Sequence, residues 1–398
     1  MTAMGQARSG AWARVPAAAA AALGGGALLT SGPAAAAAGW WSLAALALAG
    51  LVALLTAVSF ADLAAQSSPA SVFAHVRTRL GVLPGRLAGV LACAGWTVAG
   101  ATVAGAMGAY LWPARPRLAA VALVAAVLVA VLARWRPTPP ARWLIFVVTM
   151  VTMLVFIVAG LAIDPVAQAV PTDPGVSGAD DPTGVLTAAG VLSFGFLNAD
   201  RVRSPRTAAG TVVAVAAMSG LVLWTALRQL GGPRLALSPT PLRDALAAAD
   251  GAAIDPLLTL GLLVGALLSI RVLLDRAADE VADLASEGEF PAAAVPHRYL
   301  LVAIAMAGIA LVADPGWAVQ LAATLTLGAF AFVNSAARTL CRTDRSTWIR
   351  TGCCGLFLCV VVGVNISLAA LATAVAVLGA GAAAGTVRVR RARAATPG

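Results

Sequence analysis

The sequence predicts an all-α, polytopic membrane protein with about twelve transmembrane helices, on two observations. Of its 398 residues, 60% are hydrophobic and only 11% are charged, whereas soluble domains carry about 25% charged residues. Apolar runs also recur along the whole chain, and about 20 such residues cross a hydrocarbon core of about 30 Å. Because these runs are continuous rather than alternating, they favour helices over the strands of a barrel.

The apolar runs follow one another with short connections, and no stretch between them is long enough to form a soluble domain. We expect membrane spans at 16–38, 40–63, 86–111, 117–134, 142–163, 184–200, 207–230, 254–274, 298–313, 316–340, 349–364 and 366–386. The charged segment 275–284 has apolar residues at helical spacing. It is expected to lie along the cytoplasmic surface or to form a solvated connecting helix.

The 27 basic residues are all arginines, and the formal net charge is +10. Such a charge can indicate nucleic-acid binding, but the distribution of the arginines along the chain favours membrane orientation instead. With the N-terminus inside, the arginines that fall outside are Arg115, Arg117, Arg228, Arg234 and Arg243. This asymmetry follows the positive-inside rule. It predicts that both termini are cytoplasmic and that the protein has no nucleic-acid partner.

The N-terminal arginines and the apolar run after them could also form a cleaved secretory signal. Cleavage would place Arg77, Arg79 and Arg86 outside if the remaining spans inserted independently. We therefore expect the first span to be retained.

Residues that commonly bind metals or catalyse reactions are few. The histidines are His75 and His297, and the five cysteines form no C-x-x-C pair. No G-x-S-x-G or H-E-x-x-H motif is present. The sequence therefore predicts no metal site, no cofactor and no enzyme activity. A membrane enzyme with a lipid-linked substrate is the least favoured function.

Three consecutive glycines, Gly24, Gly25 and Gly26, occur inside the first apolar run, and Gly32-Pro33 follows. Each glycine costs a helix about 1 kcal/mol relative to alanine. One explanation is an interrupted helix, which is tolerated in a membrane where the backbone is buried in protein or lines a cavity. The other is close helix packing through small residues.

A second interruption, "SFGFLNAD" at 193–200, lies in the sixth span. If the first ten spans form two halves of five, spans 1 and 6 correspond. Paired broken helices in two inverted repeats indicate the binding site of a secondary transporter. The free amides of such breaks favour a carboxylate and the free carbonyls favour an ammonium, so a zwitterionic amino acid suits both.

At these motifs the chain resembles the amino acid-polyamine-organocation (APC) permeases. Gly24 to Gly32 is similar to the family's G-x-G-I-F element, with Ala27 and Leu28 in place of Ile-Phe. Ser59 to Ala64 is similar to S-F-A-E-L-A, with Asp62 in place of Glu, and 282–291 is similar to the segment that follows span 8 in the family. The segment 202–206 departs from the family, because its N-P-x-R-like element comes early and lacks the acidic pair.

The resemblance implies a LeuT-like fold of two inverted five-helix repeats with two appended helices. Its expected parts are an N-terminal tail at 1–15, a first repeat at 16–163, an external acidic loop at 164–183, a second repeat at 184–340, two further helices at 341–386 and a basic tail at 387–398.

The resemblance also implies which residues bind the substrate. The backbone amides of Gly24, Gly25 and Gly26, with the neighbouring Ala27 and Leu28, are expected to face a carboxylate. Phe194, Gly195 and Phe196 are expected to offer carbonyls to an amine together with an aromatic gate. From their place in the sequence, Asn198 and Asp200 are the polar side chains near this break that could contact the substrate.

Coupling by protons or by sodium is left open. Asp62 and Asp200 are candidates for coupling or gating because charged residues inside membranes are commonly functional. For Asp62 we favour a structural role, because it lies near the cytoplasmic end of its span. Thr259 and Ser269 in span 8 could supply oxygens to sodium, but such hydroxyls more often bond to neighbouring helices or to their own backbone. Arg271 and Asp275 are spaced i, i+4 and are expected to pair.

The function that this pattern favours is a secondary transporter of amino acids or related small amines in the cytoplasmic membrane. Its partners would be that substrate and the lipid bilayer, and the oligomeric state is left open. The alternative is a member of the same fold that does not transport and acts as a sensor or assembly partner.

Overall fold

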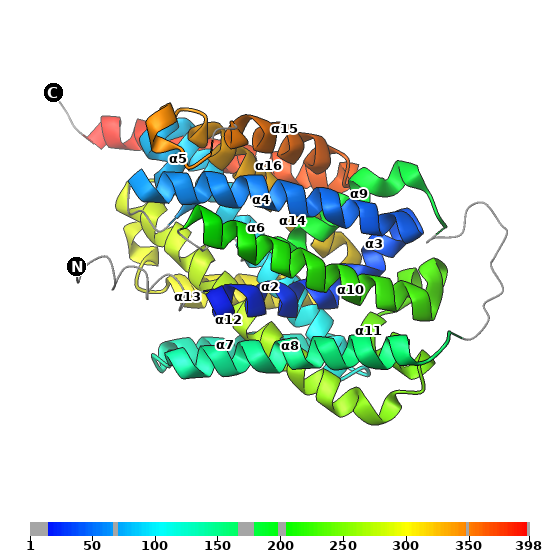
Figure 1. Ribbon diagram of the computed structural model, residues 1–398. Coiled ribbons are helices and arrows are strands. Elements are labelled where there is room, and N and C mark those ends of the chain that lie inside the picture. The colour runs from blue at the N-terminus through cyan, green and yellow to red at the C-terminus, as the bar shows by residue number, and fades with distance from the viewer. Residues whose placement is uncertain (1–14, 67–70, 166–178, 198–203, 348–349, 396–398) are drawn as a thin grey trace, which may run out of the picture.

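The computed structural model describes residues 15–66, 71–165, 179–197, 204–347 and 350–395, which form helices and connecting turns without a strand (Figure 1). The α-helices are α2 (Val15–Leu29), α3 (Ser31–Ala38), α4 (Ser42–Gln66), α5 (Val72–Leu80), α6 (Val82–Leu111), α7 (Pro116–Leu132), α8 (Pro139–Ala162), α9 (Val185–Ser193), α10 (Pro205–Leu237), α11 (Pro241–Ala248), α12 (Asp255–Ser286), α13 (Arg298–Val312), α14 (Pro315–Ala337), α15 (Thr351–Val364) and α16 (Leu368–Ala395). Short 3-10 helices are η1 (Gly39–Trp41), η2 (Pro182–Gly184), η3 (Phe194–Phe196), η5 (Ala252–Ile254), η6 (Ala292–Ala294) and η7 (Arg342–Asp344).

Every expected span coincides with one or two of these helices. The first span is divided between α2 and α3, and the sixth between α9 and η3. Among the described residues, six helical segments are long and apolar enough to cross a membrane, and α15 and α16 form a pair that bends by 117°. The predicted multi-pass, all-α fold class is confirmed.

The outer surface of several helices is apolar, as lipid contact requires. Val129 on α7, Leu144 on α8 and Ile304 on α13 are each at least 60% exposed. A soluble protein rarely shows large contiguous apolar surfaces. The hydrocarbon core of a bilayer is the environment in which this surface is stable.

The bundle has two distinct ends. The start of α2 and the last turns of α16 lie at the same end as α5 and the α7–α8 connection (Figure 1). We call this the basic end because it carries Arg77, Arg79, Arg134 and Arg136. Helices α3 and α11 lie at the opposite end (Figure 1).

The described flanks of the acidic loop expected at 164–183, residues 164–165 and 179–183, lie at that opposite end. Asp180 accepts a hydrogen bond of 2.8 Å from the amide of Trp40, which attaches the loop to η1. Asp181 accepts hydrogen bonds from the hydroxyl and the amide of Thr183, and these bonds lower the pKa of this exposed carboxyl below its usual value.

Helix α12 corrects the expectation for segment 275–284. The segment is neither a separate surface helix nor a solvated connection, because α12 continues through it to Ser286. Ala277 and Ala278 on this part of the helix are fully buried. The carboxylate of Glu280 accepts hydrogen bonds from the amides of Val72 (2.6 Å) and Phe73 (3.1 Å). The carboxyl group of Glu280 therefore caps the first turn of α5 instead of meeting solvent.

Candidate functional site

Helix α2 is continuous through the three glycines. It extends to Leu29, and the interruption of the first span falls at Thr30. The amide and the hydroxyl of Thr30 both donate to the carbonyl of Gly26, at 3.1 Å and 2.8 Å. The expected unwinding at Gly24, Gly25 and Gly26 is therefore absent, and their amides belong to the helical ladder. Ala27 and Leu28 are helical, and their side chains lie outside the description.

The glycines instead allow α2 to lie very close to α12 and to η3. A Cβ atom at Gly24 would overlap the backbone of Gly265 on α12. At Gly25 it would lie 2.8 Å from the hydroxyl oxygen of Ser269, and at Gly26 it would lie 2.7 Å from the Cα of Gly195 in η3. The packing explanation for the glycines is the one that the structure supports. Bulkier residues would separate α2 from both α12 and η3.

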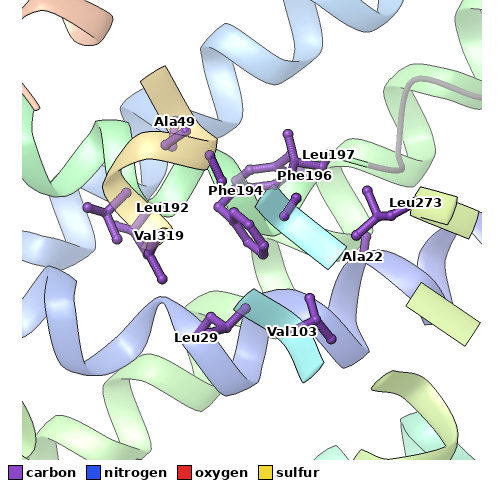
Figure 2. Packing of buried hydrophobic residues seen from close by; sticks show 14 of the residues in the cluster. Ala22, Leu29, Ala49, Val103, Leu192, Phe194, Phe196, Leu197, Leu273 and Val319 are labelled. Atoms are coloured by element: carbon purple, nitrogen blue, oxygen red, sulfur yellow. The ribbon is translucent and has the colours of Figure 1, made fainter. Parts of the chain in front are cut away.

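The second interruption lies against the continuous part of α2, at Gly26. Helix α9 tightens into η3, whose last hydrogen bond joins the amide of Leu197 to the carbonyl of Phe194 at 3.2 Å. Phe194 and Phe196 are 3% and 4% exposed. Figure 2 shows both rings among apolar side chains that include Ala22 of α2 and Val103 of α6.

The polar residues that follow η3, Asn198 and Asp200, lie outside the described residues. Helix α10 begins at Pro205. The structure therefore leaves their expected contacts with a substrate as predictions.

An arginine that sequence reasoning missed occupies the carbonyl end of η3. Arg276 of α12 donates a hydrogen bond of 2.6 Å from its guanidinium to the carbonyl of Leu197. Its Cζ atom lies 3.7 Å from the ring centre of Trp96 on α6. Trp96 is fully buried, and its indole N–H has no hydrogen-bond partner among the described residues.

The apolar spacing of segment 275–284 was the signal that could have placed Arg276 inside the protein. Leu274, Ala277, Ala278 and Val281 form a helical stripe that continues the buried face of α12. The charges between them favour a surface position and conceal this signal in the sequence.

The remaining expected site residues are dispersed. Thr259 lies in the first turns of α12, far from the basic end of the bundle, and Ser269 lies beside Gly25. Ten residues of helix, about 15 Å, separate the two hydroxyls, so they cannot ligate one ion together. Asp62 is 3% exposed and accepts a hydrogen bond of 3.1 Å from the amide of Ser346. That contact ties α4 to the α14–α15 connection and agrees with a structural role.

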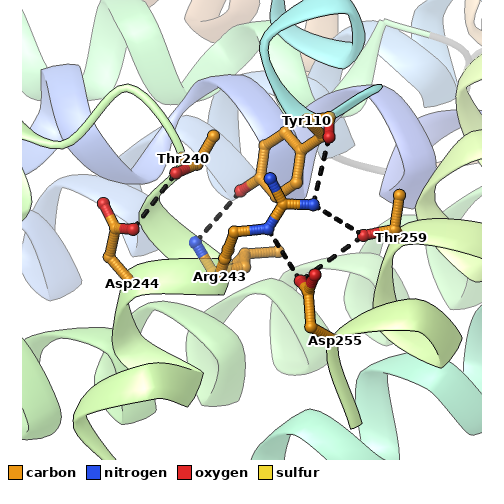
Figure 3. Close-up of polar contacts among 7 residues, drawn as sticks. Tyr110, Thr240, Arg243, Asp244, Asp255 and Thr259 are labelled. Carbon is orange, nitrogen blue, oxygen red and sulfur yellow. Dashed lines mark hydrogen bonds and ion pairs between the residues drawn. The ribbon is translucent and has the colours of Figure 1, made fainter. Parts of the chain in front are cut away.

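Thr259 belongs to a polar network that fixes α11 at the opposite end (Figure 3). Arg243 of α11 pairs with Asp255 at 2.7 Å and donates to the hydroxyl of Thr259 at 3.0 Å. It also donates to the carbonyl of Tyr110 at 3.0 Å, and the hydroxyl of Tyr110 accepts from the amide of Leu242 at 3.1 Å. The network joins α11 to the ends of α6 and α12 and covers the bundle on this side.

The centre of the bundle is closely packed. A cavity of about 10 Å³ lies beside Phe196 and is also lined by Thr56 and Ser193, which is space for about one water molecule. No group of three or more His, Cys, Asp or Glu side chains that could hold a metal ion occurs among the described residues. The chemistry that this centre offers is backbone carbonyls, hydroxyls and aromatic faces.

No established family profile matches the chain. An uncharacterized transporter of Mycobacterium tuberculosis is 32% identical over 324 residues, which cover 74% of this chain and 71% of the relative. An uncharacterized transporter of Mycobacterium bovis matches to the same extent.

Among solved structures, a mutant of the manganese transporter of Eremococcus coleocola superposes with a TM-score of 0.56 at 13% identity, over 97% of this chain and 96% of that one. The same transporter in complex with an aromatic bis-isothiourea compound gives 0.55 at 13% identity, over 96% of both chains. These likenesses show a shared architecture, and the expected LeuT-like fold is confirmed. The mycobacterial relatives show that the chain belongs to their family of membrane transporters.

Proposed function

We propose that the protein is a secondary transporter that moves amino acids or related small amines by alternating access, and that the substrate binds between α2 and η3. The observation that carries this proposal is the contact of two interrupted spans at Gly26 and Gly195. Interrupted helices at corresponding positions of two repeats are typical of transporter binding sites. We also propose that the chain is a divergent APC-type permease.

We propose an amine as the substrate because a cationic group of the protein already lies at the carbonyl end of η3. The carbonyl of Leu197 and the ring of Trp96 together bind the guanidinium of Arg276. A substrate ammonium needs the same two partners, a carbonyl acceptor and an aromatic face. Arg276 therefore occupies the position of the substrate amine while the site is closed, and it must leave when the substrate binds.

A divalent metal ion is the competing substrate, because the solved structures of similar fold are manganese transporters. Manganese prefers about six oxygen ligands, with carboxylates among them. The described residues around η3 present apolar side chains and carbonyls. These groups suit an organic amine better than a divalent ion.

The arginine distribution supports one orientation in the membrane. We propose that the basic end faces the cytoplasm and that α11 lies on the external side. Alternating access then requires Arg276 to move for release inward and the Arg243 network to open outward.

The test is a thermal-shift screen of purified protein against amino acids, polyamines and manganese, followed by counterflow in proteoliposomes with each compound that stabilises it. Saturable exchange of an amino acid or amine is the expected result. Exchange of manganese alone would replace the substrate class. Stabilisation without any exchange would favour a sensor of the same fold.

A further inference from the structure

A cavity outside the site described above opens at the basic end of the bundle. It has a volume of about 470 Å³ and lies between α2, the α7–α8 connection, α12 and α13. Three arginines line it, Arg136, Arg142 and Arg271, and the acidic side chains on its wall are Asp275 and Asp279. The charge of the lining is therefore positive by one unit.

An apolar groove continues from this cavity along the side of the bundle. Its volume is about 300 Å³ and it lies between α7, α8 and α12. Pro137, Leu268 and Arg271 line both spaces, so the cavity and the groove are adjoining. The remaining wall of the groove is formed by side chains such as Ala126, Val127, Ala130, Ile145, Val264 and Leu267.

The guanidinium groups of the cavity retain donors for a ligand. Arg142 donates from Nε to the carbonyl of Pro137 at 3.1 Å. Arg271 donates to the carbonyl of Trp135 at 2.8 Å and makes a longer contact of 3.5 Å with Asp275. A guanidinium has five N–H donors. These contacts fix the two side chains in place and leave further N–H groups to meet an anion.

We propose that an anionic phospholipid binds here, with its phosphate among Arg136, Arg142 and Arg271 and an acyl chain in the groove. Charge complementarity selects the headgroup, since basic pockets beside membrane helices attract anionic lipids. Trp135 is 56% exposed where the groove meets the cavity, a position typical of headgroup-level aromatic side chains.

The dimensions of the groove agree with this occupant. From Val264 to Arg271 it follows seven residues of α12, about 10 Å. One leaflet contributes about 15 Å of hydrocarbon, half of a core of about 30 Å. An acyl chain whose headgroup lies at the arginines can therefore place about the first 10 Å of its length in the groove.

A bound lipid would contact the helix that forms the substrate site. Ala18 of α2 lines the same cavity as the arginines of α8 and α12. The lipid thus bridges the start of α2 to these two helices. This inference does not depend on which substrate the transporter carries.

The test measures thermal stabilisation of the detergent-purified protein by phosphatidylglycerol, with phosphatidylcholine of the same acyl chains and inorganic phosphate as comparisons. The same samples are examined by native mass spectrometry. We expect saturable stabilisation and one retained lipid with phosphatidylglycerol. Equal stabilisation by phosphatidylcholine would overturn the headgroup assignment, and equal stabilisation by phosphate would overturn the role of the groove.

Two variants test the arginine cluster and the apolar groove of the proposed lipid site separately. The double variant Arg136→Gln, Arg142→Gln removes charge, and Ala130→Trp fills the groove without altering an arginine. Each is expected to weaken lipid binding at least tenfold, while Arg79→Gln, an exposed arginine on α5, leaves it unchanged. Both variants are first checked for the melting temperature of the lipid-free protein, so that loss of fold is recognised. Unchanged lipid binding in either folded variant would overturn the proposal.

Discussion

The guanidinium of Arg276 stacks on the ring of Trp96 at 3.7 Å and simultaneously donates to the carbonyl of Leu197 at 2.6 Å. Helix α12 thereby supplies a cation to the end of η3, next to a ring from α6. This contact connects the helix break to the basic end of the bundle. The carbonyl end of η3 is thus occupied by a group of the protein itself.

Replacing Arg276 by glutamine is expected to raise the apparent affinity for the transported amine roughly tenfold. A cation–π contact and a charged hydrogen bond are together worth about 1–3 kcal/mol, which the substrate no longer has to displace. Arg276→Lys keeps the cation and is expected to change affinity less. Binding is measured by isothermal titration with the compound identified by counterflow.

The control for this change is Arg79→Gln on the surface of α5. Weaker binding in Arg276→Gln, together with an unchanged melting temperature, would show that the arginine helps to hold the substrate instead of competing with it.

Gly26→Ala is expected to destabilise the protein by about 1–3 kcal/mol, because the added methyl group would meet the Cα of Gly195 at 2.7 Å. The matched control is Gly308→Ala on α13, where nothing lies within 4 Å of the added atom. That change is expected to be neutral or stabilising by up to about 1 kcal/mol. Thermal unfolding of the two variants in the same detergent measures the difference, and equal melting temperatures would contradict the close packing.

Glu280→Ala is expected to lower the free energy of unfolding by about 2–5 kcal/mol, because it leaves the amides of Val72 and Phe73 without their hydrogen-bond acceptor in a buried place. Glu287 provides the comparison. Its ion pair with Arg77 is 2.7 Å long, but the Glu287 side chain is 46% exposed, so Glu287→Ala is expected to cost less than about 1 kcal/mol. Denaturant or thermal unfolding that gave similar losses would show that the cap on α5 is unimportant.

The proposed orientation predicts how cysteines react with a membrane-impermeant maleimide. Cys341 is exposed at the start of η7, at the basic end, and is expected to be labelled only after the cells are permeabilised. Asp250→Cys, at the exposed end of α11, is expected to be labelled in intact cells. The reverse pattern would invert the orientation and place α11 in the cytoplasm.

The sequence by itself determined the helices and their membrane environment. The length of each apolar run and the near absence of charge within it are local properties, and a bilayer requires every backbone group in such a run to bond within its own helix. The interruption of the sixth span could also be predicted from the chain, because Gly and polar residues inside an apolar run are local signals, whereas the glycine triplet of the first span lies in continuous helix and the break falls at Thr30. Because these signals are local, all the spans coincide with helices, including the divided sixth span.

Only the tertiary structure decided what the interruptions do. Gly24 faces Gly265, and Gly26 faces Gly195. The partners in each pair are far apart along the chain, and no periodicity of the sequence predicts that they meet. The free energy of such a contact depends on the shape of both surfaces, and this is why α2 stays helical through its glycines and breaks at Thr30. For the same reason the sequence alone predicts a solvent-facing position for the charged segment that contains Arg276, whereas the partners of Arg276, an aromatic ring and a carbonyl, lie inside the fold.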